Sequence, residues 1–143
     1  MICSSAELIH QLVENIQARD MVLGKLASDA ASSAIDGRYM PAIACLAILA
    51  EQAVKFSNDK TEGNFYEQIE ALKRSSILSE VEAKNLGDLK EIRNKMFHES
   101  HYVWVVEDEN GDAAFFSEEC AKICLWNKMA IPVLATCARL SGN

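Results

Sequence analysis

The sequence contains little turn-forming material and few aromatic residues. Its 143 residues include six glycines and two prolines, and aromatic residues make up 7%. All-β sandwiches and barrels need a tight turn after each short strand, so this scarcity argues against them. Ala, Leu, Glu and Lys, which favour helices, are abundant instead. The composition therefore predicts an all-α fold.

Long apolar runs and an excess of positive charge are also missing. The longest apolar stretch, Pro41 to Ala50, ends at Glu51, whereas a membrane helix needs about 20 apolar residues. The N-terminus lacks the basic and apolar regions of a signal peptide. Acidic residues outnumber basic ones 21 to 14, which gives a net charge of −7. We therefore expect a cytoplasmic protein with no membrane contact, which could bind nucleic acid only through a local site.

The length and the cysteine pattern indicate one domain over residues 1–143, since domains typically span about 100–200 residues. Five cysteines cannot all pair, and four of them lie in apolar segments. We expect reduced cysteines, mostly in the core, because disulfides are rare in the cytoplasm. Cys120 and Cys124, four positions apart, are expected to pack in the core rather than bind a metal.

Apolar periodicity predicts the helices. Six apolar residues recur at helical spacing and indicate one long amphipathic helix over residues 5–35: Ile9, Leu12, Ile16, Leu23, Leu26 and Ala30. Pro41 suits the first turn of a second helix, which is apolar on nearly every side and should be the most buried. Phe65 begins a short third helix. Ser79 and Glu82 form a capping box that opens a fourth helix, ending near residue 98.

A β-hairpin is expected between the fourth and last helices. The β-branched and aromatic run Tyr102–Val106 and the run 113–116 flank Asn110-Gly111, a strong hairpin signal. Ser117 can cap a last helix that continues to about Leu140, which Pro132 should kink or interrupt. These elements predict a bundle of about five helices with a small β-hairpin before the last helix.

Three polar residues share the end of the expected fourth helix: Arg93, Asn94 and His98. Carbonyl groups at a helix end favour positive charge, so His98 can hold a proton near neutral pH. Asn94 lies four positions before His98, on the same face, where its amide can orient the imidazole. An imidazole that moves a proton beside a guanidinium that binds phosphoryl oxygens can cleave RNA through its own 2′-hydroxyl. Capping and surface charge are the alternative explanation of these residues.

Arg93 and His98 do not point the same way on a regular helix. Five positions correspond to about 140° around the axis. The two side chains meet only if the helix frays at His98, if the long arginine side chain bends around the helix, or if a second copy of the helix completes the site. The last option predicts a homodimer.

The segment Ile92–His98 resembles the R-x4-H motif of the HEPN superfamily. In the commonest form of that motif the arginine is followed by a polar residue, often Asn, and Asn94 stands there in this chain. The apolar segment Pro41–Glu51 resembles the second helix of several HEPN families, and residues 65–89 resemble their approach to the motif. The resemblance covers about residues 38–100 and implies a HEPN-like helical bundle.

This resemblance implies a metal-independent endoribonuclease that acts on RNA as a homodimer. Such an enzyme could serve as a toxin or a defence component. His98 would then be the general acid and base, Arg93 would stabilise phosphoryl charge, Asn94 would orient His98, and Lys95 could contact phosphate. The alternative is an inactive HEPN-fold regulator or protein or RNA interaction module. One toxin subgroup has the extended motif R-x4-H-x-Y, but Ser100 replaces its tyrosine here. That departure argues against the tyrosine-modifying antitoxin of that subgroup, while an antitoxin of another kind or a regulatory partner protein stays an expected partner.

Glu51 ends an apolar helix and is the expected supporting residue of this site. A mostly buried carboxylate needs a partner, so we expect Glu51 to face Arg93 or a second copy, unless it is partly exposed. A motif buried in ion pairs with Glu51, or His98 packed under Trp104, favours the inactive module. A cleft that brings Arg93 and His98 together and is rimmed by lysines favours the enzyme. Five other basic residues are expected on solvated faces: Lys55, Lys73, Arg74, Lys90 and Lys95.

Two patterns partly match metal sites. The segment from Asp108 to Glu119 nearly fits a calcium loop, but Ala113 occupies the position where the loop needs glycine. The flanking runs also predict strands, so a solvated hairpin tip is the stronger interpretation. His98 and His101 are three positions apart, whereas the zincin pattern needs four. We therefore expect no metal and no cofactor.

Overall fold

The computed structural model describes residues 4–58, 63–98, 105–107 and 110–142. These residues form an all-α bundle with one small two-stranded sheet, as predicted. The elements in chain order are α1 (Ser5–Arg19), α2 (Met21–Ile35), α3 (Tyr39–Ser57), α4 (Phe65–Arg74), α5 (Glu80–His98), β1 (Val105–Glu107), β2 (Ala113–Phe115) and α6 (Glu119–Ser141).

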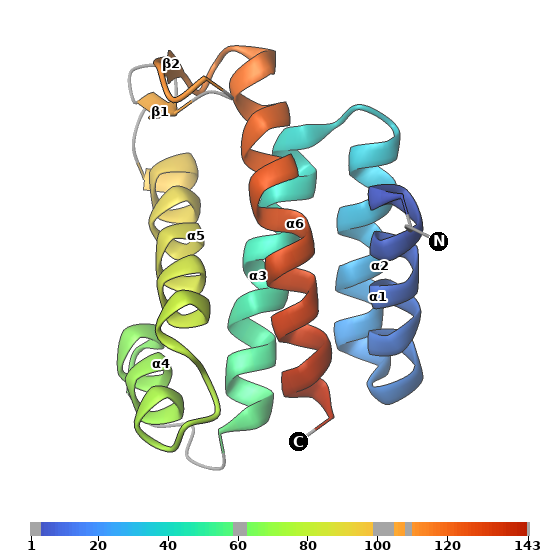
Figure 1. The fold of residues 1–143 in the computed structure, drawn as a ribbon, viewed down its shortest axis with the longest axis vertical. Coiled ribbons are helices and arrows are strands. Elements are labelled where there is room, and N and C mark those ends of the chain that lie inside the picture. The colour runs from blue at the N-terminus through green and yellow to red at the C-terminus, as the bar shows by residue number, and fades with distance from the viewer. Residues whose placement is uncertain (1–3, 59–62, 99–104, 108–109, 143) are drawn as a thin grey trace.

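Two long helices, α3 and α6, pack side by side in the middle of the bundle (Figure 1). The pair α1 and α2 lies on one flank, and α4 and α5 lie on the other. The hairpin sits at the end of the bundle where α6 begins. The helix that carries the R-x4-H motif, α5, therefore packs against both central helices.

The single helix expected over residues 5–35 is wrong, because the chain breaks at Asp20. Asp20 has extended backbone angles (φ −150°, ψ 129°) and separates α1 from α2. Its backbone N–H donates to the Ile16 carbonyl, and its carboxylate accepts from the Leu23 N–H at 2.8 Å. The same residue thus ends one helix and caps the next. Residues of the predicted stripe still reach the core from both helices: Ile16 of α1 and Leu23 and Ala30 of α2 are buried.

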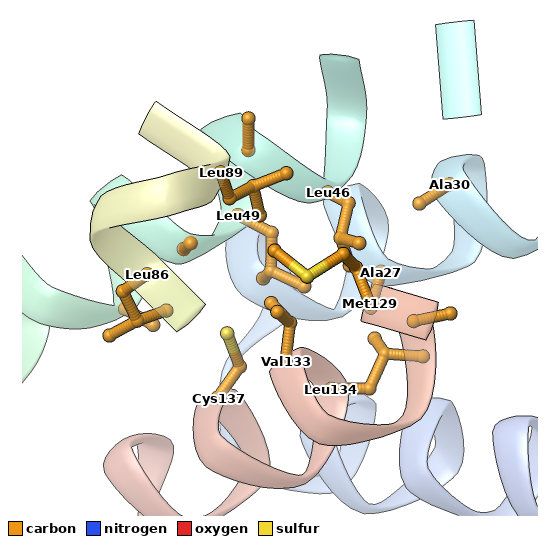
Figure 2. Close-up of a cluster of buried hydrophobic side chains, with 14 of the residues drawn as sticks. Ala27, Ala30, Leu46, Leu49, Leu86, Leu89, Met129, Val133, Leu134 and Cys137 are labelled. Carbon is orange, nitrogen blue, oxygen red and sulfur yellow. The ribbon is translucent and has the colours of Figure 1, made fainter. Parts of the chain in front are cut away.

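All six helices contribute apolar side chains to the core, and Figure 2 shows the part of it between α2, α3, α5 and α6. Leu46 and Leu49 of α3 meet Leu89 of α5, and Val133 of α6 is likewise fully buried. Full burial of one such side chain contributes about 1.5–3 kcal/mol. The expectation that α3 is the most buried helix is wrong: 8 of its 19 residues are buried, against 12 of 23 in α6, which shares the central position and also packs against α1.

By length and composition alone, α3 and α6 could each cross a membrane. About half of each apolar window is buried inside the bundle, 44% in α3 and 56% in α6. Core packing therefore accounts for the apolar character of both helices.

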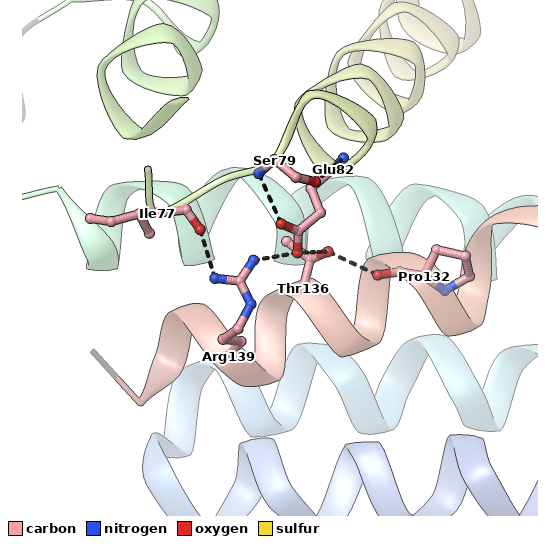
Figure 3. A network of polar contacts seen from close by, with 6 residues as sticks. All are labelled: Ile77, Ser79, Glu82, Pro132, Thr136 and Arg139. Carbon is pink, nitrogen blue, oxygen red and sulfur yellow. Dashed lines mark hydrogen bonds and ion pairs between the residues drawn. The ribbon is translucent and has the colours of Figure 1, made fainter. Parts of the chain in front are cut away.

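A polar network fixes the start of α5 against the end of α6 (Figure 3). The predicted capping box is present: the Ser79 N–H donates to Glu82 Oε1 at 3.0 Å, and the Glu82 N–H donates to Ser79 Oγ at 3.1 Å. Arg139 pairs with Glu82 and also donates to the Ile77 carbonyl at 2.6 Å. Thr136 donates to Glu82 at 3.2 Å. These contacts set the direction of the helix that carries the motif.

The predicted hairpin is confirmed where the structure describes it. Val105 pairs with Phe115 and Glu107 pairs with Ala113 in an antiparallel register. Gly111 has φ +81°, the left-handed conformation that a tight hairpin turn requires. The first part of the expected strand, Tyr102 to Trp104, lies outside the described residues.

Three expectations about the last helix need correction. Ser117 does not cap α6; Glu118 is the N-cap residue, and its side chain makes no capping hydrogen bond. The interruption expected as one effect of Pro132 is absent, since α6 continues through it, and the kink expected as the other stays a prediction. Cys120 is exposed rather than in the core, whereas Cys137 is fully buried. Cys120 lies in the first turn of α6, ahead of the segment that packs against the bundle.

Candidate functional site

The R-x4-H motif occupies the last turns of α5, whose backbone is helical through His98. Leu86, Leu89 and Met96 are buried and hold this helix against the bundle. Arg93 and Lys90 lie on the side of α5 that meets α3, as their contacts with Glu51 show.

Arg93, Lys90 and Glu51 form an ion cluster between α5 and α3. Lys90 Nζ lies 2.6 Å from Glu51 Oε1, and Arg93 Nη1 lies 3.0 Å from the same oxygen. The side chains of Glu51, Lys90 and Arg93 are 15%, 18% and 28% exposed. The expectation that Glu51 faces Arg93 is therefore confirmed. We refer to these three residues as the Arg93 cluster.

Two aromatic rings flank the Arg93 cluster. Lys90 Nζ lies 5.8 Å from the centre of the Phe65 ring, and the Arg93 guanidinium carbon lies 5.5 Å from the centre of the Phe97 ring. Each cation is thus within range of a cation–π interaction. Phe65 is nearly buried, whereas Phe97 is 61% exposed. Shielding by the bundle and Phe65 strengthens the ion pairs, and it is greater at Lys90 than at Arg93.

The charges of the Arg93 cluster do not balance, since two cations share one carboxylate. The Arg93 Nε atom is buried and has no hydrogen-bond partner among the described residues. A guanidinium grips phosphate through two parallel N–H groups, and Nη1 of Arg93 already binds Glu51. A phosphate at this position would also meet the negative charge of Glu51. As folded, the arginine is thus engaged inside the bundle.

The remaining candidate residues of the motif are Lys95, Asn94 and His98. Lys95 lines a hollow of about 280 Å³ between α5, β1 and α6, together with Lys84 and Lys128. Positions two apart on a helix face different directions, so Lys95 and Arg93 serve different surfaces. Asn94 is partly buried. The side chain of His98 lies outside the described part of the structure, so its predicted hydrogen bond with Asn94 stays a prediction.

Sequence reasoning missed Lys90, which was expected on a solvated face but is mostly buried against Glu51. A signal was present in its spacing. Lys90 follows the buried Leu86 by four positions and precedes Arg93 by three, so all three lie on one side of α5. Lys73 is also less exposed than expected, at 28%, because it pairs with Glu70 and Glu80.

The calcium-like segment is described only in part, because Asp108 and Glu109 lie outside the described residues. Glu119 begins α6 and pairs with Lys122 at 3.7 Å. Within the described ranges, no group of three or more His, Cys, Asp or Glu side chains could hold a metal ion.

No family model, no curated protein and no solved structure matches the chain.

Proposed function

We propose that this chain is a HEPN-like helical interaction module in which Arg93 has a structural role and RNA is not cut. The observation that carries this proposal is the ion pair between Arg93 and Glu51, reinforced by Lys90 on the same carboxylate oxygen. An arginine that is paired with a carboxylate inside its own bundle is less able to bind phosphate, which favours a module over an enzyme. Such a module acts by binding a second copy of itself, a regulatory partner protein or RNA.

The energetics of the Arg93 cluster support a structural role. Removing Arg93 deletes one of the two ion pairs on Glu51 and the packing of the arginine side chain between α5 and α3, while Lys90 still neutralises the carboxylate. Arg93 also links α5 to α3 at a point distant from the Glu82–Arg139 network. The two polar contacts together fix α5 at both of its ends.

A metal-independent ribonuclease is the second candidate function, and one observation favours it. The Arg93 cluster carries two cations and one carboxylate, and Arg93 Nε has no hydrogen-bond partner among the described residues. This surplus of positive charge would attract a phosphodiester if Glu51 moved aside. In that case His98 would transfer the proton, Asn94 would orient it, and a homodimer would complete the cleft.

Cleavage of labelled RNA, measured together with urea melts, separates the two candidates. For the module we expect no cleavage by the wild type, and a loss of about 1–2 kcal/mol in the free energy of unfolding for Arg93→Ala. The matched control is Arg74→Ala, which removes an exposed arginine from the end of α4 and should change stability by less than about 0.5 kcal/mol.

The ribonuclease predicts the opposite pattern. Arg93→Ala and His98→Ala would each abolish cleavage, with losses of about 10²–10⁴-fold for His98, and neither would unfold the protein. Products would end in 2′,3′-cyclic phosphate, and DNA would resist because it lacks the attacking hydroxyl. Wild-type cleavage that requires both residues would therefore overturn the module.

A further inference from the structure

A hollow of about 260 Å³ lies between α1, α2 and α6, on the flank of the bundle away from α5. Its lining includes Val13 of α1 and Trp126 of α6, which are 7% and 4% exposed. Tyr39, the first residue of α3, closes one side. Pockets for drug-sized ligands measure roughly 300–1,000 Å³, so this one is suited to a single small ring system.

The lining of this hollow carries no Asp, Glu, Lys or Arg, although such residues make up 24% of the chain. Three other hollows in the described structure each contain both Lys and Glu. A charged ligand would lose part of its hydration in this hollow without gaining an opposite charge. The lining therefore selects for an uncharged molecule.

Polar side chains in the lining have unused hydrogen-bonding capacity. The Tyr39 hydroxyl and the Asn127 amide make no hydrogen bond with another described residue, and the same holds for the hydroxyls of Ser28 and Ser32. Each of these groups can donate and accept. A ligand with a polar edge could pair with them, while its apolar face covers Val13 and Trp126.

We propose that this hollow binds a small uncharged aromatic heterocycle of about the size of indole. Two aromatic residues and an apolar floor suit a flat ring, and the unpaired hydroxyl and amide groups suit a ring nitrogen. Ile35, which is 85% exposed at the lining, would be partly covered by the bound molecule. The proposal does not depend on the role of Arg93.

Calorimetric titration at pH 8 with three ligands of one ring type tests the charge selectivity. Indole is neutral, indole-3-acetate carries a negative charge and tryptamine a positive one. His10, at the lining, pairs with Glu14 at 3.0 Å, so an anionic and a cationic analogue are both needed as probes. We expect indole to bind more tightly than either charged analogue. Absence of indole binding at millimolar concentration, or tighter binding of a charged analogue, would overturn the proposal.

A matched pair of variants tests the location. Ser32→Phe places a large side chain at an exposed position of the lining, and Asn15→Phe makes a similar change at an exposed position of α1 outside the lining. We expect Ser32→Phe to weaken indole binding at least tenfold and Asn15→Phe to leave it unchanged. Equal binding by both variants would contradict this location. Conversion of a dimer to a monomer by Ser32→Phe would show that the hollow is instead an interface between copies.

Discussion

Individual side chains decide how the motif of this protein is interpreted. The sequence predicted that Glu51 faces Arg93 or a second copy, because a carboxylate at the end of an apolar helix needs a partner, and the structure shows the pair with Arg93. It did not predict that Lys90 joins them, because lysine is usually a surface residue. The consequence for function depends on this third residue: with two cations on one oxygen, Glu51 is held firmly beside Arg93.

The Glu82 carboxylate should make folding stability depend on pH. Its partial burial alone would raise its pKa, but hydrogen bonds from Ser79 and the Arg139 guanidinium lower the pKa below its usual value of 4.5. A lowered pKa means that this carboxylate stabilises the fold above about pH 4.5, and that the stabilisation is lost as the pH falls through the folded-state pKa. Glu82→Gln removes this contribution.

Urea melts at pH 7 and pH 3 measure the effect. We expect the wild type to lose more stability between these pH values than Glu82→Gln does. Glu80→Gln, at an adjacent carboxylate that is 85% exposed, is the control and should behave like the wild type. An identical pH dependence for wild type and Glu82→Gln would show that the network of Figure 3 does not form in solution.

Elements marked by a short sequence pattern were predictable. The break between α1 and α2 at Asp20, which depends on tertiary contacts, was not. The capping box at Ser79 and the turn at Gly111 are written in short sequence patterns, and both are present. The break at Asp20 has no glycine or proline to mark it. It becomes favourable because α1 and α2 fold back on each other, and residues distant in sequence supply that packing. Asp20, followed by an apolar run, was the one available cue.

The close approach of α1 and α2 depends on a glycine. A Cβ atom added at Gly24 would lie 2.6 Å from the Cα of Gln17, so the helices would have to separate. We expect Gly24→Ala to reduce the free energy of unfolding by about 1–3 kcal/mol. At Gly87, in α5, the nearest atom to an added Cβ is 4.0 Å away on Tyr66.

Gly87→Ala is therefore the matched control for this prediction. Alanine favours helix over glycine, so Gly87→Ala should increase stability by roughly 0.5–1 kcal/mol. Thermal or urea unfolding of both variants measures the difference. Equal effects of the two substitutions would contradict the close contact between α1 and α2.

On the scale of the whole molecule, the protein carries a net charge of −7, while the Arg93 cluster holds two cations and one carboxylate within the bundle. Arg93 faces α3, and His98 follows it by five positions, about 140° around α5. A single bundle therefore does not present both residues on one surface unless α5 frays at its end or the Arg93 side chain bends around it. A second copy with its α5 near a two-fold axis would bring an arginine and a histidine onto one surface. Closed two-fold dimers are also the commonest oligomers.

We predict a homodimer in solution, with a mass of about twice the 15.8 kDa of the chain. Sedimentation equilibrium at tens of micromolar protein measures this directly. Only monomer at that concentration would contradict the prediction. It would leave the structural role of Arg93 untouched, because the Arg93 cluster lies within one chain.

The structural role of Arg93 is the central claim, and a double-mutant cycle with Glu51 tests it most directly. Urea melts would be measured for the wild type, Glu51→Ala, Arg93→Ala and the double variant. We expect Arg93→Ala to cost about 1–2 kcal/mol in the wild type, and to be neutral or stabilising once Glu51 is absent, because the guanidinium is then an uncompensated, largely buried cation. The same loss of stability in both backgrounds would contradict the account.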